Sequence, residues 1–318
     1  MTAQGTVVRR DTAVLTRAVT VSALVPAWNE SDRIGGCIES LLQIDNPPLE
    51  IFVSAGGDDG TWEIASQFTG DRLTVVRQEP GEGKQRALRN LLRYARGDIL
   101  YLTDGDSRVS ADTFRQLLEP IITGEAEVVT GSYRPYDDEL DRPFVLYQWS
   151  IDREVDRHRT PRSEGISGAN TAITRRALLA SGAFDADVPT GTDYHLARQL
   201  RGAGIDILYI DAPVETQYAT SADVFMNRRA RWLRNTMMHG LRFNDLGEIQ
   251  ATAATLTLGA GACLAPLSWR WTKRAGVGTW LLGLTYLLFR RQHYAAALAH
   301  ERGLSMGFGY YCRLPWYT

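Results

Sequence analysis

Apolar residues recur along the chain with two different spacings. Short runs rich in aliphatic and β-branched residues alternate with longer segments whose apolar residues lie three or four positions apart. The runs predict β-strands over Thr20–Val25, Glu50–Ser54, Leu73–Arg77 and Asp98–Thr103. The segments between them predict helices over Asp32–Leu42, Thr61–Phe68 and Lys84–Ala95. Strand–helix alternation of this kind predicts an α/β fold, with a mostly parallel sheet and helices on both faces.

The pattern changes after residue 135. Helices are predicted over Phe144–His158, Asp193–Gly202 and Ser221–Phe243. A loop entering a strand is predicted over Gly165–Thr174, and a short strand over Asp206–Ile210.

Acidic residues become rare beyond Glu248, and the C-terminal region is uncharged over long stretches. Ile249–Trp269 carries no charged residue and has about the ~20 positions that a membrane span needs. The second uncharged run, Gly276–Phe289, is shorter, and aromatic and basic residues flank both. We expect an N-terminal extension (1–19), a catalytic domain (20–243) and a membrane-associated helical region (244–318). A soluble helical hairpin docked on the domain is the alternative.

Composition narrows the function classes. A formal net charge of −2 over 318 residues argues against a nucleic-acid-binding protein, which usually has a basic excess. The three cysteines lie far apart and predict no disulfide framework, as in a reducing compartment. Residues 1–20 contain no apolar run typical of a secretory signal. We therefore expect the catalytic domain on the cytoplasmic side of the cell membrane.

Polar clusters follow three of the predicted strands, where ligands bind in α/β sheets: residues 26–30, 56–61 and 104–106. Asp104 and Asp106 come directly after a buried strand and could hold a hard divalent cation, Mg²⁺ or Mn²⁺. Asp185 and Asp187 have the same spacing with no strand before them. The position at a strand end, more than the spacing, therefore favours the first pair.

Lys84 follows a glycine-rich turn at a helix start, where backbone N–H groups and a positive charge suit a diphosphate. A simple turn with a solvated lysine is the alternative. Asp193 opens a predicted helix, either as a general base or as a residue favoured in the first helical turn. We expect His195 to flank that base only.

A basic cluster marks the helix predicted over 221–243. Arg228 and Arg231 share a face and could present guanidinium groups to a phosphate, with Trp232 as a stacking surface. A helix lying on an anionic membrane surface would look much the same.

Taken in order over residues 20–240, these motifs resemble the family 2 glycosyltransferases with the Rossmann-like GT-A fold. The resemblance implies nucleotide contacts from Pro26, Glu30 and Asp59, and a diphosphate contact from Lys84. It implies that Asp104 and Asp106 bind nucleotide and metal, that Asn170 lies near the donor sugar, and that Asp193 is the catalytic base. Arg228, Arg231 and Trp232 resemble the Q-x-x-R-W signature of membrane-embedded cellulose, chitin and hyaluronan synthases.

Three positions depart from the family pattern. Ala55 stands where the family has an Asp that touches the base, which leaves the nucleotide less certain. Thr192 replaces the Glu before the base, and Arg228 replaces Gln in the last motif, which puts processivity in doubt.

The function expected from the resemblance is inverting transfer of a sugar, most simply from a UDP-sugar. The acceptor is a hydroxyl of a lipid-linked or polysaccharide molecule at the membrane, so membrane lipid is an expected partner. A glycoside hydrolase is one alternative, but it leaves Lys84 and the basic helix unused. A sugar-1-phosphate nucleotidylyltransferase is another, but the first predicted strand is not followed by a glycine-rich G-x-G-T-R loop. A non-catalytic membrane scaffold or sugar-binding module is the alternative from a different class.

Overall fold

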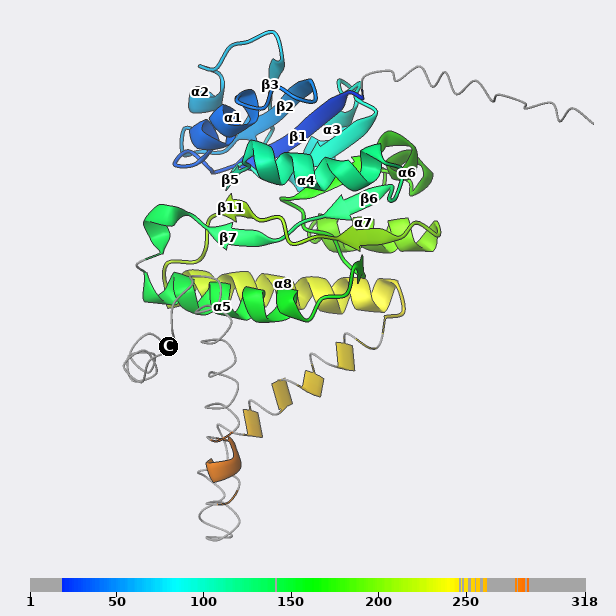
Figure 1. Cartoon of the computed structure of the whole chain (residues 1–318). Helices are drawn as coiled ribbons and strands as arrows, with labels where there is room; N and C mark the ends of the chain where they lie inside the picture. Colours follow the sequence, from blue (N-terminus) through cyan, green and yellow to red (C-terminus); the bar gives the residue numbers. More distant parts are fainter. Residues whose placement is uncertain are drawn as a thin grey trace, which may run out of the picture.

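The structure is a computed structural model that describes residues 19–140 and 142–245, with short stretches between residues 247 and 285 (Figure 1). The predicted N-terminal extension, residues 1–19, lies almost entirely outside the described residues, as does most of the predicted region 244–318.

The centre of the molecule is an eight-stranded sheet with the order β3-β2-β1-β4-β9-β6-β10-β8. β1 pairs in parallel with β2 and β4, β2 with β3, and β10 with β6. β9 runs antiparallel between β4 and β6, and β8 is an antiparallel edge. The bounds are β1 Val21–Trp28, β2 Leu49–Gly56, β3 Leu73–Arg77, β4 Ile99–Leu102, β6 Val128–Thr130, β8 Arg162–Ser163, β9 Thr171–Thr174 and β10 Ile207–Tyr209. The prediction of a mostly parallel α/β sheet is confirmed.

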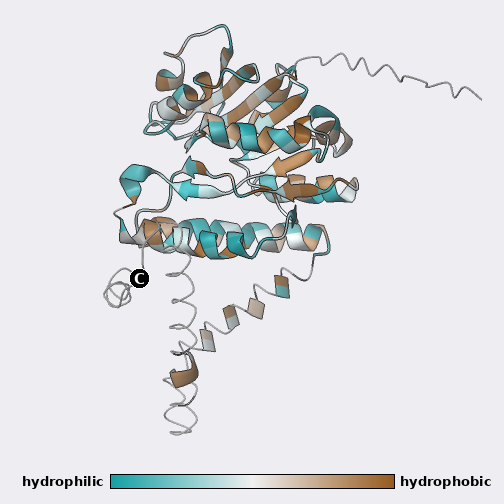
Figure 2. Cartoon of the chain, viewed as in Figure 1, coloured by the Kyte–Doolittle hydropathy of each residue, from teal (hydrophilic) through white to brown (hydrophobic). Residues whose placement is uncertain are grey.

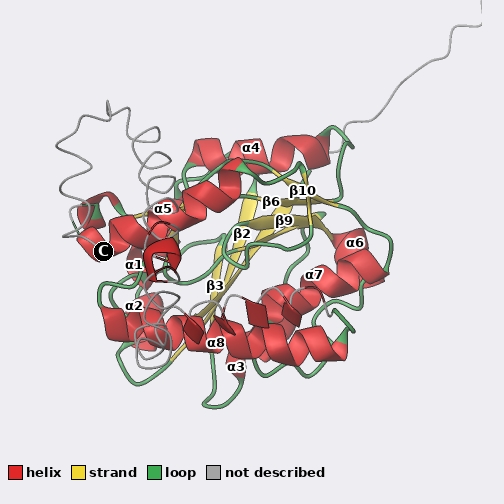
Figure 3. Cartoon of the chain, turned by 90° about the horizontal axis from the view of Figure 1, so that it is seen from below, coloured by secondary structure: helices red, strands yellow, loops and turns green. Residues whose placement is uncertain are grey.

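Helices cover both faces of this sheet, because successive strand residues point to opposite sides. In β1, Val21, Ala23 and Val25 pack with one set of helices, whereas Leu24 packs with the other. The first set is α1 Ile34–Leu42, α2 Thr61–Ala65 and α4 Ala111–Ile122; the second is α3 Gly83–Leu92, α6 Arg175–Ala180 and α7 Thr192–Gly202. Figure 3 shows α4 and α3 on opposite sides of the sheet, and Figure 2 shows the largely apolar strands between them.

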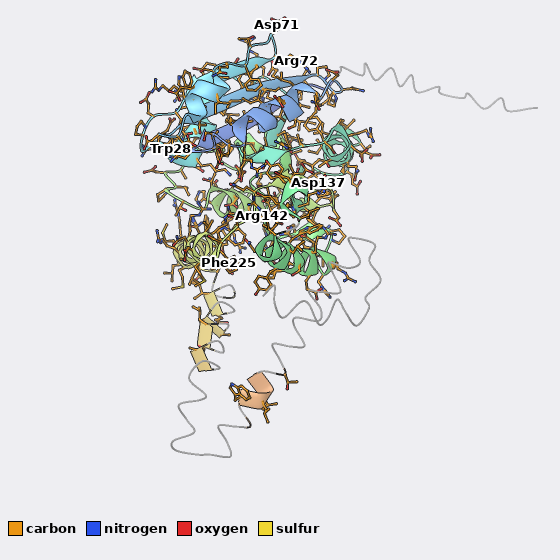
Figure 4. All side chains as sticks on the ribbon, turned by 90° about the vertical axis from the view of Figure 1, so that its left-hand side faces the viewer. Trp28, Asp71, Arg72, Asp137, Arg142 and Phe225 are labelled. Atoms are coloured by element: carbon orange, nitrogen blue, oxygen red, sulfur yellow. The ribbon has the colours of Figure 1, made fainter. Side chains whose placement is uncertain are left out.

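A smaller sheet and a pair of helices lie beyond the C-terminal part of this core. The second sheet has the order β5-β11-β7, formed by Ser107–Arg108, Val214–Thr216 and Tyr133–Pro135. Below it, α5 (Pro143–Arg157) and α8 (Ala222–Arg242) lie side by side (Figures 1 and 4). The rings of Tyr147 and Phe225, the latter labelled in Figure 4, join the two helices with centroids 6.4 Å apart. We call this pair the α5–α8 layer.

Several boundaries differ from those predicted. β1 continues to Trp28, and Pro26 therefore lies within the strand, opposite Ser54. Proline is tolerated there because the pairing with β4 already ends at Leu24, so no ladder bond to that side is lost. The helices α4 and α6 were not predicted, although Ser110 and Thr174 cap them. The strands β5, β7, β8 and β11 have two or three residues each, too few to show a period.

The membrane prediction is not tested by this fold. In the part of the chain that the structure describes, no helix has both the length and the apolar character needed to cross a bilayer. Ile249–Trp269 and Gly276–Phe289 lie largely outside that part.

Candidate active site

The first element of the site is the turn between Asp104 and Asp106 at the carboxyl end of β4. Gly105 lies against the end of β1, where a Cβ would be 2.6 Å from Cβ of Ala27. Only glycine allows so close an approach without displacing the strand. The thiol of Cys37 on α1 donates to the carbonyl of Asp104 (3.4 Å). The two aspartates are therefore fixed at the strand edge, as predicted.

Residues distant in the sequence hold Asp106 in this position. The hydroxyl of Thr216 on β11 donates to Oδ2 of Asp106 (3.3 Å), and the Tyr136 hydroxyl donates to its carbonyl (2.6 Å). Burial, followed by the charge of Asp104, raises the pKa of Asp106 to about 6. Sequence reasoning missed Thr216 and Tyr136, and the short strands next to them carried no signal for them.

Glu30, at the end of β1, brings a third carboxyl group to the same place. Burial, and then the charges of Asp106 and Asp104, raise the pKa of Glu30 to about 8. Three carboxyl groups are thus concentrated here, and a divalent cation with oxygen ligands would favour their charged forms. Among the described residues, no three His, Cys, Asp or Glu side chains have the arrangement of a complete metal site. Asp104 and Asp106 therefore fit a cation that takes its other ligands from substrate phosphates and water.

Lys84 in the first turn of α3 forms an ion pair with Asp104. Burial lowers the pKa of Lys84, but the carboxylates of Asp104 and Asp193 outweigh that effect and raise it. The ammonium group stays charged and lies where a diphosphate beside Asp104 would meet it.

Asp193 lies next to this pair across Gly168. A Cβ on Gly168 would be 3.0 Å from Nζ of Lys84 and 3.3 Å from Cβ of Asp193. The absence of a side chain at this position lets the predicted base and the predicted diphosphate contact approach each other. Asp193 is exposed and does not cap α7, because the N-cap residue is Gly191. Its carboxyl group is therefore open to a substrate.

The turn before Asp193 is held by α8. Nε2 of His239 donates to the carbonyl of Thr190 (2.8 Å), and the Thr190 hydroxyl donates to Oδ1 of Asn235 (2.8 Å). Gly191 has φ +73, and a Cβ there would be 2.7 Å from Nε2 of His239. Glycine is required at this turn on both grounds. Neither Asn235 nor His239 was identified from the sequence, because Thr190, which both of them contact, lies 45 and 49 positions earlier in the chain.

His195 faces away from the reacting groups. Its ring lies against His239 and Phe243, with centroids 5.8 and 5.2 Å away. Burial, together with the charges of Arg242 and His239, lowers the pKa of His195 to about 4, so the ring is neutral. This placement agrees with the expected flanking position.

Some basic residues of α8 lie near the site, whereas others are exposed to solvent. Arg228 donates to the carbonyl of Gln217 (2.8 Å). Its positive charge partly opposes the rise in the pKa of Glu30 and of Asp106. Arg231 is exposed, and Trp232 is 53% exposed with the guanidinium of Arg229 over its ring. The structure therefore brings Arg228 to the carboxylates and leaves Arg231 and Trp232 on the surface of the α5–α8 layer.

Two other predicted donor contacts have structural partners. Asp59 accepts hydrogen bonds from the Thr61 hydroxyl and from the backbone N–H groups of Ser31 and Thr61. Slight burial raises the pKa of Asp59, but these bonds outweigh it and lower the pKa to about 2. Asn170 is fully buried; its amide donates to the carbonyls of Ser132 and Ala212 and accepts from Tyr101.

That Asn170 lies near the donor sugar stays a prediction, and the hydrogen bonds of its side chain give it a structural role as well. Its side chain joins β9 to the segments after β6 and β10. Gly168, two residues earlier, is the part of this segment that borders Lys84 and Asp193.

Comparison with known proteins places this site in a family. The family model described as "Glycosyltransferase like family 2" matches residues 18–235. The chain belongs to this family. The matched range contains Glu30, Lys84, the Asp104–Asp106 turn and Asp193, so the family predicted from the motifs is confirmed.

Similar members of the family have low identity to the chain. It is 29% identical over 130 residues to glycosyltransferase GlyG of Streptococcus pneumoniae, covering 40% of the chain and 43% of that protein. It is 32% identical over 181 residues to glycosyltransferase AglD of Haloferax volcanii, covering 54% of the chain and 26% of that protein. The chain thus spans less than half the length of either relative.

A solved structure supports the predicted GT-A-like fold. The mannosyltransferase PcManGT from Pyrobaculum calidifontis, in complex with GDP-Man and Mn²⁺, superposes with a TM-score of 0.56 at 21% identity. The match covers 90% of this chain and 87% of that one.

Proposed function

We propose that this family 2 member is a metal-dependent, inverting glycosyltransferase. It moves a sugar from a nucleotide-sugar donor to a hydroxyl of a lipid-linked or saccharide acceptor. The observation that carries the proposal is the meeting of Asp193 with the Lys84–Asp104 ion pair across Gly168. A base and a diphosphate-binding pair are thereby brought to one place.

Different residues bind the leaving group, hold the metal and accept the proton. Lys84 and Arg228 bind and neutralise the departing nucleoside diphosphate. Asp106, with Asp104, would hold Mg²⁺ or Mn²⁺, which supplies further positive charge against the leaving phosphates. Asp193 accepts the proton of the acceptor hydroxyl as that oxygen attacks the anomeric carbon. The attack occurs opposite the leaving group, so one displacement inverts the configuration.

The donor nucleotide is proposed to be UDP, with GDP as the second candidate. The family resemblance supports UDP. The mannosyltransferase with a similar fold was solved with GDP-Man, which supports testing GDP as well. Ala55 lacks the carboxylate that would otherwise help to select the base.

A position at the cytoplasmic face of the cell membrane is proposed from the surface of α8. This helix exposes apolar side chains, among them Met226 (63%), Leu241 (67%) and Trp232 (53%), together with Arg229 and Arg231. A basic helix with exposed apolar residues suits an anionic membrane surface. The same exposed, basic helix supports two further points of the proposal. The protein would be a membrane-associated member of the family, similar to polysaccharide synthases, and its acceptor would be presented at the membrane.

The test is calorimetric titration of the full chain with UDP, GDP and ADP, each with and without Mn²⁺. We expect one nucleotide to bind and Mn²⁺ to strengthen its binding. Sugar donors of that nucleotide would then be screened for transfer, with the configuration of the product read by NMR. If no nucleotide bound, the enzyme proposal would fail and a non-catalytic membrane scaffold or sugar-binding module would take its place.

A further inference from the structure

A cavity of about 470 Å³ opens beside Asp193. Its volume lies in the range of small-molecule sites. The wall is formed by the segment that follows α5, by β8 with the loop after it, and by α7. Asp193 is the one residue that the wall shares with the predicted donor site. A second substrate held here would lie against the base.

We propose that this cavity binds the acceptor and that it recognises a phosphate group on the acceptor. The inference rests on the proposed function, because it takes Asp193 as the base. It adds the acceptor's position and chemical class.

The cations of the wall support an anionic ligand. Arg159, Arg162 and Arg198 come from three different elements and line the same cavity. Arg198 is committed to Asp245 and forms a fixed part of the wall. The contact between Arg162 and Asp206 is 3.6 Å long and joins side chains that are 84% and 75% exposed. An exposed pair of this kind contributes little, so the Arg162 guanidinium can turn to a ligand.

Arg159 is held in a suitable orientation. Its guanidinium lies over the ring of Tyr209, 4.7 Å from the centroid, with Asp156 3.6 Å away. A guanidinium stacked on a ring keeps its N–H edge for hydrogen bonds, and two such groups match the oxygens of a phosphate. The carboxylate of Glu164 in the wall lies 3.5 Å from Arg201.

The aromatic ring of Tyr194 in the wall is already in contact with other parts of the protein. Sugars commonly stack on an open aromatic face. His239 stacks on this ring at 5.5 Å between centroids, and the Arg198 guanidinium lies 5.0 Å from its centroid. The wall therefore offers guanidinium groups more readily than an open phenol ring.

The experiment uses the full chain with its donor site filled by the nucleotide and Mn²⁺ found in the titration above. Glycerol 3-phosphate is the soluble probe, and glycerol is the neutral control. We expect saturable binding of glycerol 3-phosphate and no binding of glycerol in the same range. An equal response to both would overturn the phosphate assignment. A failure of the nucleotide to bind is detected before the probe is added and concerns the proposed function alone.

Matched variants locate the binding. Arg159→Gln with Arg162→Gln should weaken glycerol 3-phosphate binding by about tenfold or more, because charge-assisted hydrogen bonds are lost. Arg176→Gln is the control, since Arg176 is exposed on α6 and pairs with Glu127. Equal losses in the double variant and the control would overturn the proposal. Unchanged nucleotide affinity in each variant reports intact folding.

A third variant fills the cavity without changing its charge. A Cβ on Gly165 meets nothing within 4 Å, so Gly165→Leu extends into open space. It should weaken glycerol 3-phosphate binding while nucleotide affinity is retained. Full affinity for the probe in this variant would place the phosphate outside the cavity.

Vesicles distinguish the two sources of such a phosphate. Phosphatidylcholine vesicles with and without phosphatidic acid are sedimented with the wild type, the double variant and Arg176→Gln. A loss of phosphatidic-acid binding in the double variant alone indicates a lipid headgroup. Equal vesicle binding by all three, with glycerol 3-phosphate binding still lost in the double variant, indicates a soluble phosphate. Unchanged binding of both probes in the double variant overturns the proposal.

Discussion

The central sheet and the α5–α8 layer are held in place by different interactions. In the sheet, fully buried aliphatic residues such as Leu24, Val25 and Leu41 form two continuous clusters. The buried apolar cluster of the α5–α8 layer is small, with Val145, Trp149 and Tyr218 as its members.

Polar contacts, more than apolar burial, attach α5 to the segments that follow β10 and β11. Arg153 donates two hydrogen bonds to the carboxylate of Asp211 (2.8 and 2.6 Å). Gln148 exchanges two bonds with the backbone of Ala219, and Tyr218 donates to Asp152 (2.8 Å). Apolar burial is non-directional and sums over many residues, whereas each polar contact depends on its own geometry.

The site lies where these two regions meet. The sheet sets the positions of Asp104, Asp106 and Lys84, and α8 sets Arg228 and the turn before Asp193. Substitutions that disturb the α5–α8 layer should therefore leave Asp104, Asp106 and Lys84 in place and act on the site through Arg228 and Asp193.

Asp193→Asn should reduce kcat about 10²- to 10⁴-fold, because the amide cannot accept the proton of the acceptor hydroxyl. Nucleotide affinity should stay within a few-fold of the wild type, since the sheet side of the site is intact. Transfer assays and calorimetric titration measure the two effects. Transfer at the wild-type rate would contradict the assignment of Asp193 as the base.

Asp106→Asn should reduce transfer about hundredfold or more and make nucleotide binding insensitive to Mn²⁺, because a carboxylate that would hold the metal is lost. Asp187→Asn is the matched control, since Asp187 belongs to the other Asp-x-Asp pair and is exposed. Both are measured by titration with and without EDTA. An equal response of the two variants would refute the metal role of the first pair.

Leu24→Ala should lower the free energy of unfolding by about 2–5 kcal/mol, because it leaves a cavity in a fully buried cluster. Tyr218→Phe, which removes a hydrogen bond to α5, should cost about 1.5–3 kcal/mol, the value of one hydrogen bond to a charged group. Denaturant unfolding measures both. Leu179→Ala, at a leucine that is 56% exposed, is the control and should change little. A larger cost for Tyr218→Phe than for Leu24→Ala would reverse the comparison.

The smallest effect concerns pH. Burial, with the hydrogen bond from Tyr218 opposing it and the charge of Asp156 adding to it, raises the pKa of Asp152 to about 6. The protonated carboxyl group contributes stability that is full below about pH 4 and is lost as the pH rises through about 6. Asp152→Asn keeps an acceptor for Tyr218 and cannot ionise, so its stability relative to the wild type should rise across that window.

Thermal unfolding at several pH values measures this difference. Asp71→Asn, at the exposed loop position labelled in Figure 4, is the control and should give a curve parallel to that of the wild type. A constant difference between Asp152→Asn and the wild type from pH 4 to 7 would exclude the titration of Asp152 as its source.

Much of the sheet and of the donor side could be predicted from the sequence alone. β1, β2 and β4 are buried on both faces, β3 is the partly exposed edge, and helices with a regular apolar stripe join them, so local periodicity reveals them. The Asp104–Asp106 turn, Lys84 and Asp193 were found because each lies at the end of such an element. The residue pattern that marks each of these positions extends over only a few neighbouring residues, so it can be recognised in the sequence without the fold.

Tertiary structure alone decided which of these residues meet and what holds them. Thr216 lies 110 positions from Asp106 in the sequence and donates a hydrogen bond to it. His239 lies 49 positions from Thr190 and donates a hydrogen bond to its carbonyl. The burial of Asn170, the surface position of Trp232 and the cavity beside Asp193 depend on the packing of several elements at once. Strands of two or three residues, such as β7 and β11, carry no period of their own. They exist because neighbouring strands satisfy their backbone groups, and that condition is a property of the folded chain.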